Sequence, residues 1–253
     1  MSDQPPDSPR LTRRRLLTGG ATVVIPIATA SAVLRRETPW QEGAADAPVP
    51  AAGAPSGQTY LFFTAPEAAF IEAAVARLIP ADDLGPGARE AGVPVFIDRQ
   101  LAGSFGRAET WYMQGPWGAG ESTQGYQSRL TPAGMYRAAI KAIDQQAGVE
   151  STGASFARLP ADRQDDFLQR MEQGKVELQG GVNAKSFFSM LLQNTIEGFW
   201  SDPIYGGNAQ MVGWRLIGFP GARYDHTPWV SQHGKPYPLP PVGLKGRPEW
   251  NKS

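Results

Sequence analysis

The side chains that could support metal or acid–base chemistry in this sequence are two histidines and the carboxylates, because cysteine is absent. His226 and His233 are seven residues apart in a proline-rich stretch, and Asp225 is the only carboxylate near them. A zinc site needs three or four ligands at a fixed geometry. The pair is therefore interpreted as solvent-exposed or interface histidines, with a metal pair as the alternative.

Two pairs of adjacent aspartates, Asp82 with Asp83 and Asp165 with Asp166, could serve glycoside hydrolysis if they lined a sugar cleft. Adjacent acids on a helix point apart, so capping or solvation of the helix is the competing interpretation. No G-x-S-x-G elbow accompanies the serines and histidines, and the glycine pair at 206–207 lacks the setting of a dinucleotide loop. These residues by themselves predict no catalytic, cofactor-binding or metal-binding site.

The composition excludes several kinds of function for this protein. The 253 residues carry 24 basic and 24 acidic side chains, so no global field attracts nucleic acid or an anionic membrane. Without cysteine there are no thiolate nucleophiles, disulfides, cysteine-ligated iron–sulfur clusters or covalently attached haem. Hydrophobic residues make up 41%, which is enough apolar material for a packed core. We expect a folded protein that holds little redox chemistry of its own.

The N-terminal residues are typical of an export signal. Arg13 and Arg14 precede an uncharged stretch over residues 16–34, and the A-x-A sequence at 30–32 offers a cleavage site. An uncleaved membrane anchor is the alternative, although glycines, threonines and a proline make the stretch only weakly apolar. We predict a twin-arginine signal over residues 1–32. That pathway carries folded cargo, so the translocase is an expected partner and the periplasm the expected location.

Beyond the leader, the pattern predicts a mainly α fold: a single irregular helical domain with long ordered loops. Residues 33–59 form an Ala/Pro/Gly-rich linker, residues 60–219 the helical domain, and residues 220–253 a proline-rich extended tail that lies along the domain or covers a partner. Residues 103–127 hold aromatic side chains without a clear period, which is typical of a long ordered loop or a binding surface. Apolar periodicity places helices between Thr64 and Pro80, around 93–101, and over 131–148, 161–173 and 183–199.

The most informative stretch follows the last of these helices. The Asp202–Pro203 pair predicts a turn, the next two glycines permit unusual dihedral angles, and Asn208 can cap a new short helix. One interpretation is a buried structural turn whose aromatic residues fill the core. The other is a docking surface, because aromatic side chains commonly anchor interfaces. The candidate interface residues are Trp200, Asp202, Tyr205, Gly206, Gly207, Asn208, Trp214, Phe219 and Pro220.

This stretch also carries a resemblance. Its DPIYGGN at 202–208, with GW at 213–214 and IGFPG at 217–221, closely resembles the small, or gamma, subunit of gluconate 2-dehydrogenase-type enzymes, the subunit 3 family. The resemblance covers residues 61–221, and the later motif is its more specific part. Shorter motifs agree with it: IPAD at 79–82, GPGA at 85–88, AGV at 91–93 and ID at 97–98.

The resemblance implies a non-catalytic accessory subunit. In this family the small subunit pairs with a flavin-containing large subunit that oxidises gluconate, a keto-gluconate, or a sugar or polyol, and a multihaem cytochrome c subunit passes the electrons on. It implies FAD in the large subunit, haem c in a third subunit, membrane association through the complex, and a role for this chain in export and maturation of the flavoprotein. The alternatives are a free-standing periplasmic carbohydrate-binding protein, a carboxylate-based carbohydrate enzyme, or a structural envelope protein.

Overall fold

A computed structural model describes residues 59–118, 120–121, 124–151 and 153–246 of the chain. The predicted signal over residues 1–32 and nearly all of the 33–59 linker lie outside the described residues. Within them the fold is helical, with three isolated β-bridges and no strand, which confirms the mainly α fold class. The α-helices are α2 (Ala65–Leu78), α3 (Val93–Ala102), α4 (Pro132–Glu150), α5 (Ala161–Glu172), α6 (Ala184–Trp200) and α7 (Val212–Ile217).

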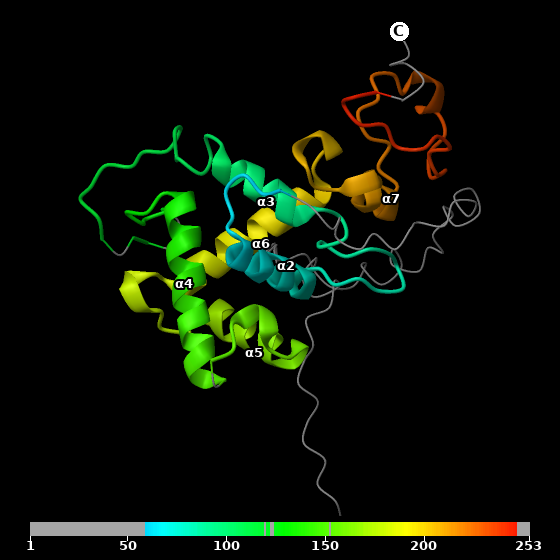
Figure 1. The fold of residues 1–253 in the computed structure, drawn as a ribbon. Coiled ribbons are helices and arrows are strands. Elements are labelled where there is room, and N and C mark those ends of the chain that lie inside the picture. The colour runs from blue at the N-terminus through cyan, green and yellow to red at the C-terminus, as the bar shows by residue number, and fades with distance from the viewer. Residues whose placement is uncertain (1–58, 119, 122–123, 152, 247–253) are drawn as a thin grey trace, which may run out of the picture.

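Helix α6 forms the centre of the domain (Figure 1). It packs against α2, α3, α4, α5 and α7, and it buries an aromatic and aliphatic face that includes Phe187 and Leu191. Asn194 on the same helix is also buried, and its side-chain N–H donates to the Tyr136 hydroxyl at 2.8 Å. Because this pair satisfies the polar groups that burial would otherwise leave unpaired, the core tolerates an amide at its centre.

The helix starts follow the sequence signals. The carboxylate of Glu67 accepts the N–H of Thr64 at 2.8 Å, as expected for a capping box at the start of α2. Thr131 and Asn183 accept the N–H groups of Gly134 and Ser186 at the starts of α4 and α6. The predicted N-termini are therefore confirmed, since each rests on a local side-chain-to-backbone bond.

The predicted end of α4 at Gly148 is wrong, because the helix continues to Glu150. The glycine with a positive φ is Gly153, whose N–H donates to the Gly148 carbonyl at 2.7 Å. A glycine in the left-handed conformation is the usual helix terminator. The sequence offered two glycines here, and only the backbone shows which one adopts that conformation.

The connection between α3 and α4 contains no helix in its described residues, and it reaches away from the helical body (Figure 1). Its base is held by aromatic contacts, with the Trp111 ring 5.7 Å from Phe105 and 5.0 Å from Tyr126. Tyr112 beside it is 82% exposed. None of the helices in the described part of the chain combines the length and apolarity that crossing a bilayer requires.

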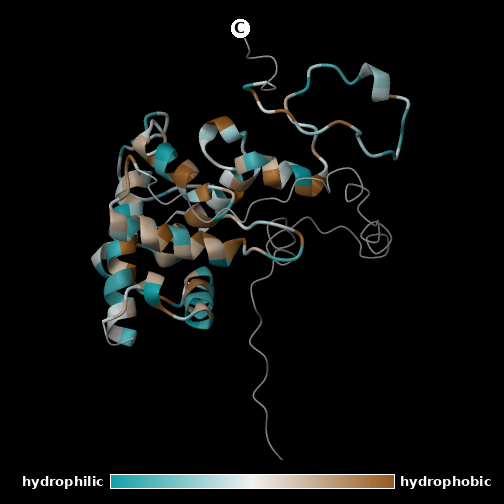
Figure 2. Ribbon diagram, turned by 45° about the vertical axis from the view of Figure 1, so that its right-hand side comes forward, coloured by the Kyte–Doolittle hydropathy of each residue, from teal (hydrophilic) through white to brown (hydrophobic). Residues whose placement is uncertain are grey.

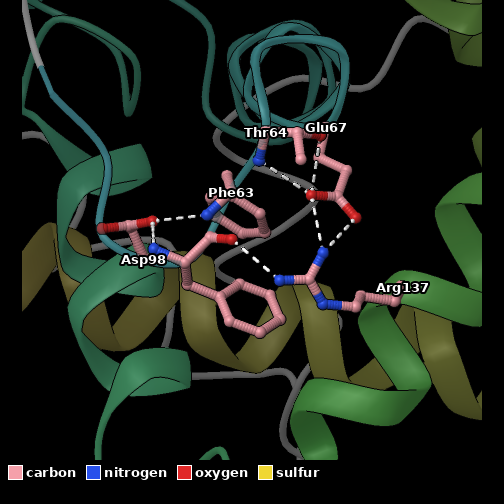
Figure 3. A network of polar contacts seen from close by, with 6 residues as sticks. Phe63, Thr64, Glu67, Asp98 and Arg137 are labelled. Atoms are coloured by element: carbon pink, nitrogen blue, oxygen red, sulfur yellow. Dashed lines mark hydrogen bonds and ion pairs between the residues drawn. The ribbon is translucent and has the colours of Figure 1, made fainter.

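A buried carboxylate fixes the segment that leads into the domain. Asp98 on α3 accepts the backbone N–H groups of Leu61, Phe62 and Phe63 at 2.7, 2.9 and 2.9 Å. Figure 3 shows the bond between Asp98 and Phe63. We call residues 61–63 the N-terminal strap. Three N–H donors neutralise much of the cost of burying one charge, because hydrogen bonds to an ionised acceptor are stronger than neutral ones.

Arg137 on α4 holds the same strap from the other side (Figure 3). Its guanidinium donates to the Phe62 carbonyl at 3.0 Å and to both oxygens of Glu67, and it lies 4.2 Å from the centre of the Phe62 ring. The strap is thus bound directly to α3 and α4, and Arg137 also joins it to Glu67 on α2. Asp98 belongs to a short family motif, but the sequence predicts no role for it, because its donors are more than 30 residues away.

Replacing Asp98 should destabilise the domain. Asp98→Ala leaves three N–H groups without an acceptor, and we expect a loss of about 2–4 kcal/mol in the free energy of unfolding. Asp98→Asn keeps one acceptor oxygen and should fall between wild type and Asp98→Ala. The measurement is urea unfolding followed by circular dichroism, with Asp166→Ala as the exposed control. Equal stability of all four proteins would contradict the role given to Asp98.

Candidate partner interface

The turn after α6 begins at Asp202, which caps two segments. One carboxylate oxygen accepts the N–H of Ile204 at 2.9 Å, and the other accepts the N–H of Leu244 at 2.7 Å. The first bond shapes the 3₁₀ turn Pro203–Tyr205, and the second attaches the end of the tail to it. Asp202 is therefore a structural carboxylate with both oxygens in use.

Gly207 allows this turn to lie against α6. A Cβ at this position would meet the Gly198 carbonyl oxygen at 2.1 Å, so no other residue fits without moving the backbone. On the other side, the Gly206 carbonyl oxygen approaches Gly92 at the start of α3, and the Ala209 N–H donates to the Ala91 carbonyl at 2.8 Å. The turn is thus held between α3 and α6.

Asn208 connects the end of α6 to the start of α7 and is fully buried. Its side-chain N–H donates to the Ser201 carbonyl at 2.8 Å, and its side-chain oxygen accepts the Gly213 N–H at 2.8 Å. Asn208, Gln210 and Met211 all have positive φ, between 47° and 59°. Left-handed conformations cost non-glycine residues roughly 1 kcal/mol each, so the buried amide has to offset the strain of this short segment.

Trp214 closes the far side of the turn. Its indole N–H donates to the Trp200 carbonyl at 2.8 Å, and its ring meets the Phe219 ring edge-to-face at 5.2 Å. Only 6% of Trp214 is exposed. Gly221 follows with φ +78° and lies close to both Trp214 and Val242. The aromatic residues of the motif therefore pack partly on each other and partly on the helix ends.

The tail leaves the domain and returns to it. Residues 220–222 and Val242, which we call the tail neck, lie side by side. The Ala222 N–H donates to the Val242 carbonyl at 2.7 Å, and the Val242 N–H donates to the Pro220 carbonyl at 3.2 Å. Between these points residues 222–241, which we call the tail loop, project beyond α7 (Figures 1 and 2). The neck is fixed to the turn after α6, and the tail loop extends from it.

The tail loop has a small internal scaffold around Tyr237. The rings of His226 and Trp229 lie 5.7 and 5.6 Å from the Tyr237 ring, and the Arg223 guanidinium lies 5.3 Å from it. Arg223 also donates to the Pro240 carbonyl. Asp225 accepts the Thr227 N–H, and this hydrogen bond lowers the pKa of the Asp225 carboxyl. These contacts give an otherwise extended segment a defined shape.

Large apolar side chains are exposed mainly in this part of the chain. Among the described residues, eight of the eleven exposed large hydrophobics lie between positions 204 and 244. We call this set the C-terminal apolar surface. Its members are Ile204, Tyr205, Ile217, Phe219, Tyr224, Val230, Leu239 and Leu244.

The structure divides the candidate interface residues into two groups. Tyr205 and Phe219 are 49% and 45% exposed and belong to the C-terminal apolar surface. The remaining candidates shape the turn or attach the tail, and Gly207, Asn208 and Trp214 are buried within the chain. The structural-turn interpretation therefore describes the buried residues of the run, whereas a docking role for the exposed Tyr205 and Phe219 stays a prediction.

Six members of the surface were absent from the candidates, namely Ile204, Ile217, Tyr224, Val230, Leu239 and Leu244. Ile204 and Ile217 lie in a 3₁₀ turn and in the six-residue helix α7, which are too short to show a period. The other four lie in the proline-rich tail, where no helical or strand period marks which side they face. The available signal was the change in composition after Phe219, which indicated the segment without indicating its residues.

The carboxylate pairs do not converge. Asp165 forms a bidentate ion pair with Arg77 at 2.7 and 2.8 Å, whereas Asp166 pairs with Arg170 at 3.0 Å. Asp82 accepts the Leu84 N–H within its own turn. In the described residues no group of three or more His, Cys, Asp or Glu side chains could hold a metal ion. A pocket between α5 and α6 has Glu177 as the single carboxylate in its lining, so it lacks an acid pair.

Comparison with known proteins gives one family. A family model described as gluconate 2-dehydrogenase subunit 3 matches residues 65–221. No curated protein and no solved structure shows significant similarity to the chain. The matched segment begins at the start of α2 and ends at Gly221, within the tail neck.

Asn208 should be essential for the geometry of the turn. Asn208→Ala removes both side-chain hydrogen bonds from a buried site, and we expect the free energy of unfolding to fall by about 2–4 kcal/mol. Gln210→Ala is the matched control, because Gln210 also has a positive φ but is exposed. Thermal and urea unfolding measure the difference. If both variants lose the same stability, the buried amide is not what holds residues 208–211.

Proposed function

This chain belongs to the gluconate 2-dehydrogenase subunit 3 family, and we propose that it is the non-catalytic small subunit of a periplasmic, flavin-dependent gluconate, sugar or polyol dehydrogenase complex. In this proposal FAD belongs to the large subunit and haem c to a cytochrome subunit that receives the electrons. The chain accompanies the folded flavoprotein through the twin-arginine pathway, stabilises it, and reaches the membrane through the complex. The oxidation itself takes place in the large subunit.

The concentration of exposed apolar side chains on the C-terminal apolar surface carries this proposal. Burying such side chains contributes roughly 25 cal/mol for each Å² removed from water, so a partner is the natural means of covering them. The aromatic members, among them Tyr205 and Phe219, are residue types that often dominate binding energy. An enzyme or binding protein acting alone would instead require polar groups converging on a ligand pocket.

The twin-arginine part of the proposal rests on the leader. A pathway for folded cargo is useful when a cofactor must be inserted before export. This sequence has no cysteine for covalent haem and no nucleotide-binding loop motif, so the cofactor that requires folding in the cytoplasm would belong to the partner. One leader can serve two proteins only when they bind each other before export.

Conservative changes in the leader test the escort role. Arg13→Lys with Arg14→Lys keeps the charge but removes the arginine pair, and we expect both this chain and the large subunit to remain in the cytoplasm. Fractionation and flavin fluorescence of the periplasm measure the outcome. Arg35→Lys with Arg36→Lys, just after the uncharged stretch, is the matched control and should leave export unchanged. Normal export of the large subunit with the first double variant would contradict the escort role.

Changes at the surface test the contact itself. Tyr205→Ser with Phe219→Ser removes two exposed aromatic rings, and we expect at least about tenfold weaker association with the large subunit, since aromatic interface anchors each contribute 1 kcal/mol or more. Tyr112→Ser with Leu84→Ser removes similar exposed side chains elsewhere and is the control. Co-purification of the yellow complex and its dissociation on dilution measure association. Unchanged association in the first variant would remove this surface from the interface.

A further inference from the structure

We infer that the face of the large subunit that covers the C-terminal apolar surface is acidic and rich in neutral hydrogen-bond donors, and that the tail loop is a preformed arm in this contact. The inference rests on the proposed function and adds the chemistry of the partner. Three observations carry it: the charges around the surface, the backbone of the tail loop, and the scaffold that shapes it.

The charges around the C-terminal apolar surface are mainly positive. Between residues 200 and 246 the chain has four basic side chains, Arg215, Arg223, Lys235 and Lys245, against two acidic ones. Both acids already accept backbone N–H groups, Asp202 at the neck and Asp225 in the tail loop. Arg99 on α3 adds a further cation, because its guanidinium lies beside Gly206.

The helical body holds both paired and unpaired cations, since in the described residues Lys141 and Lys175 are exposed and make no ion pair. Arg77, Arg89, Arg137 and Arg170 pair with carboxylates of other segments. In the described part of the chain, Arg215 and Lys235 make no ion pair and are exposed. Complementary charge across an interface increases the association rate and excludes wrong partners, so unpaired cations around an apolar surface favour an acidic face opposite.

The backbone of the tail loop requires donors from its partner. Residues 222–241 include five prolines, which supply carbonyl groups but no N–H. The hydrocarbon of a bilayer offers no donor to such carbonyls, and irregular backbone exposed to lipid is not found there. A protein face with amide and hydroxyl groups can pair them. The surface is therefore matched to a protein rather than to a membrane.

The scaffold around Tyr237 lowers the cost of this contact. An extended segment usually loses conformational entropy when it binds, and that loss subtracts from affinity. Here His226, Trp229 and Arg223 already surround the Tyr237 ring, and the neck is joined by hydrogen bonds to Val242. The tail loop thus presents Tyr224, Val230 and Leu239 from a shape that exists before binding.

Charge reversal in the co-purified complex tests the inference. Arg215→Glu with Lys235→Glu should raise the dissociation constant of the complex with the flavin-binding large subunit at least about tenfold at about 50 mM NaCl, mainly through slower association. The difference should shrink at about 500 mM NaCl, because salt screens charges beyond a few Å. Lys141→Glu with Lys175→Glu, exposed and distant in sequence, is the control and should change the dissociation constant less than about twofold. Lys235→Glu alone, in an exposed turn, provides a variant that leaves α7 intact.

The outcomes are distinct. Weaker, salt-dependent binding of both surface variants, but not of the control, supports an acidic partner face. Equal dissociation constants for surface and control variants, or a loss of affinity that salt does not reduce, would overturn it. Binding of the full chain to phosphatidylglycerol vesicles that depends on Arg215 and Lys235, with the complex unaffected, would overturn it in favour of a membrane. If the wild-type chain forms no complex with the large subunit, the proposed function itself fails, and this is seen before any charge variant is measured.

Discussion

The C-terminal half of this structure depends on one buried amide. Asn208 donates to the last turn of α6 and accepts from the first turn of α7, so it sets the angle at which the chain leaves the helical body. Its neighbours Gln210 and Met211 adopt left-handed conformations that their side chains do not favour. Such conformations persist only where surrounding contacts determine them. The positions of Trp214, Phe219 and the tail neck all follow from this connection.

Helix α3 contacts both this region and the N-terminal strap. Its Asp98 binds the N-terminal strap, whereas Arg99, the next residue, lies beside Gly206 in the turn after α6. The segment that continues toward the predicted leader and the surface proposed to bind a partner are therefore attached to the same helix. A rigid element shared by both is suited to a subunit whose export and partner binding are proposed to be coupled.

The division of the motif into buried and exposed residues also explains how one short run can serve two roles. Glycines, an asparagine and a buried tryptophan bring two helix ends and the tail neck together, and the exposed rings of Tyr205 and Phe219 are presented on the result. Changes to the first group should act through stability, and changes to the second through association. Three further members of the apolar surface, Tyr224, Val230 and Leu239, lie on the tail loop, whose shape comes from its own aromatic contacts.

The sequence alone determined the helices and the fold class, which depend on residues close together in the chain. Capping side chains at Thr64, Thr131 and Asn183 and the apolar periodicity between them defined the helices and the fold class, because those signals act within a few residues. The motif at 202–221 also indicated the family, and the family match over residues 65–221 confirms it.

Tertiary structure decided which residues face water. Asp98 finds its donors more than 30 residues away, and Asp202 finds one of its donors 42 residues away. The side chains that form the C-terminal apolar surface follow no period, because they lie on irregular backbone or on helical segments too short to show one. Burial in such segments is set by distant contacts, so only the folded chain separates the tryptophan that fills the core from the tyrosine that remains exposed.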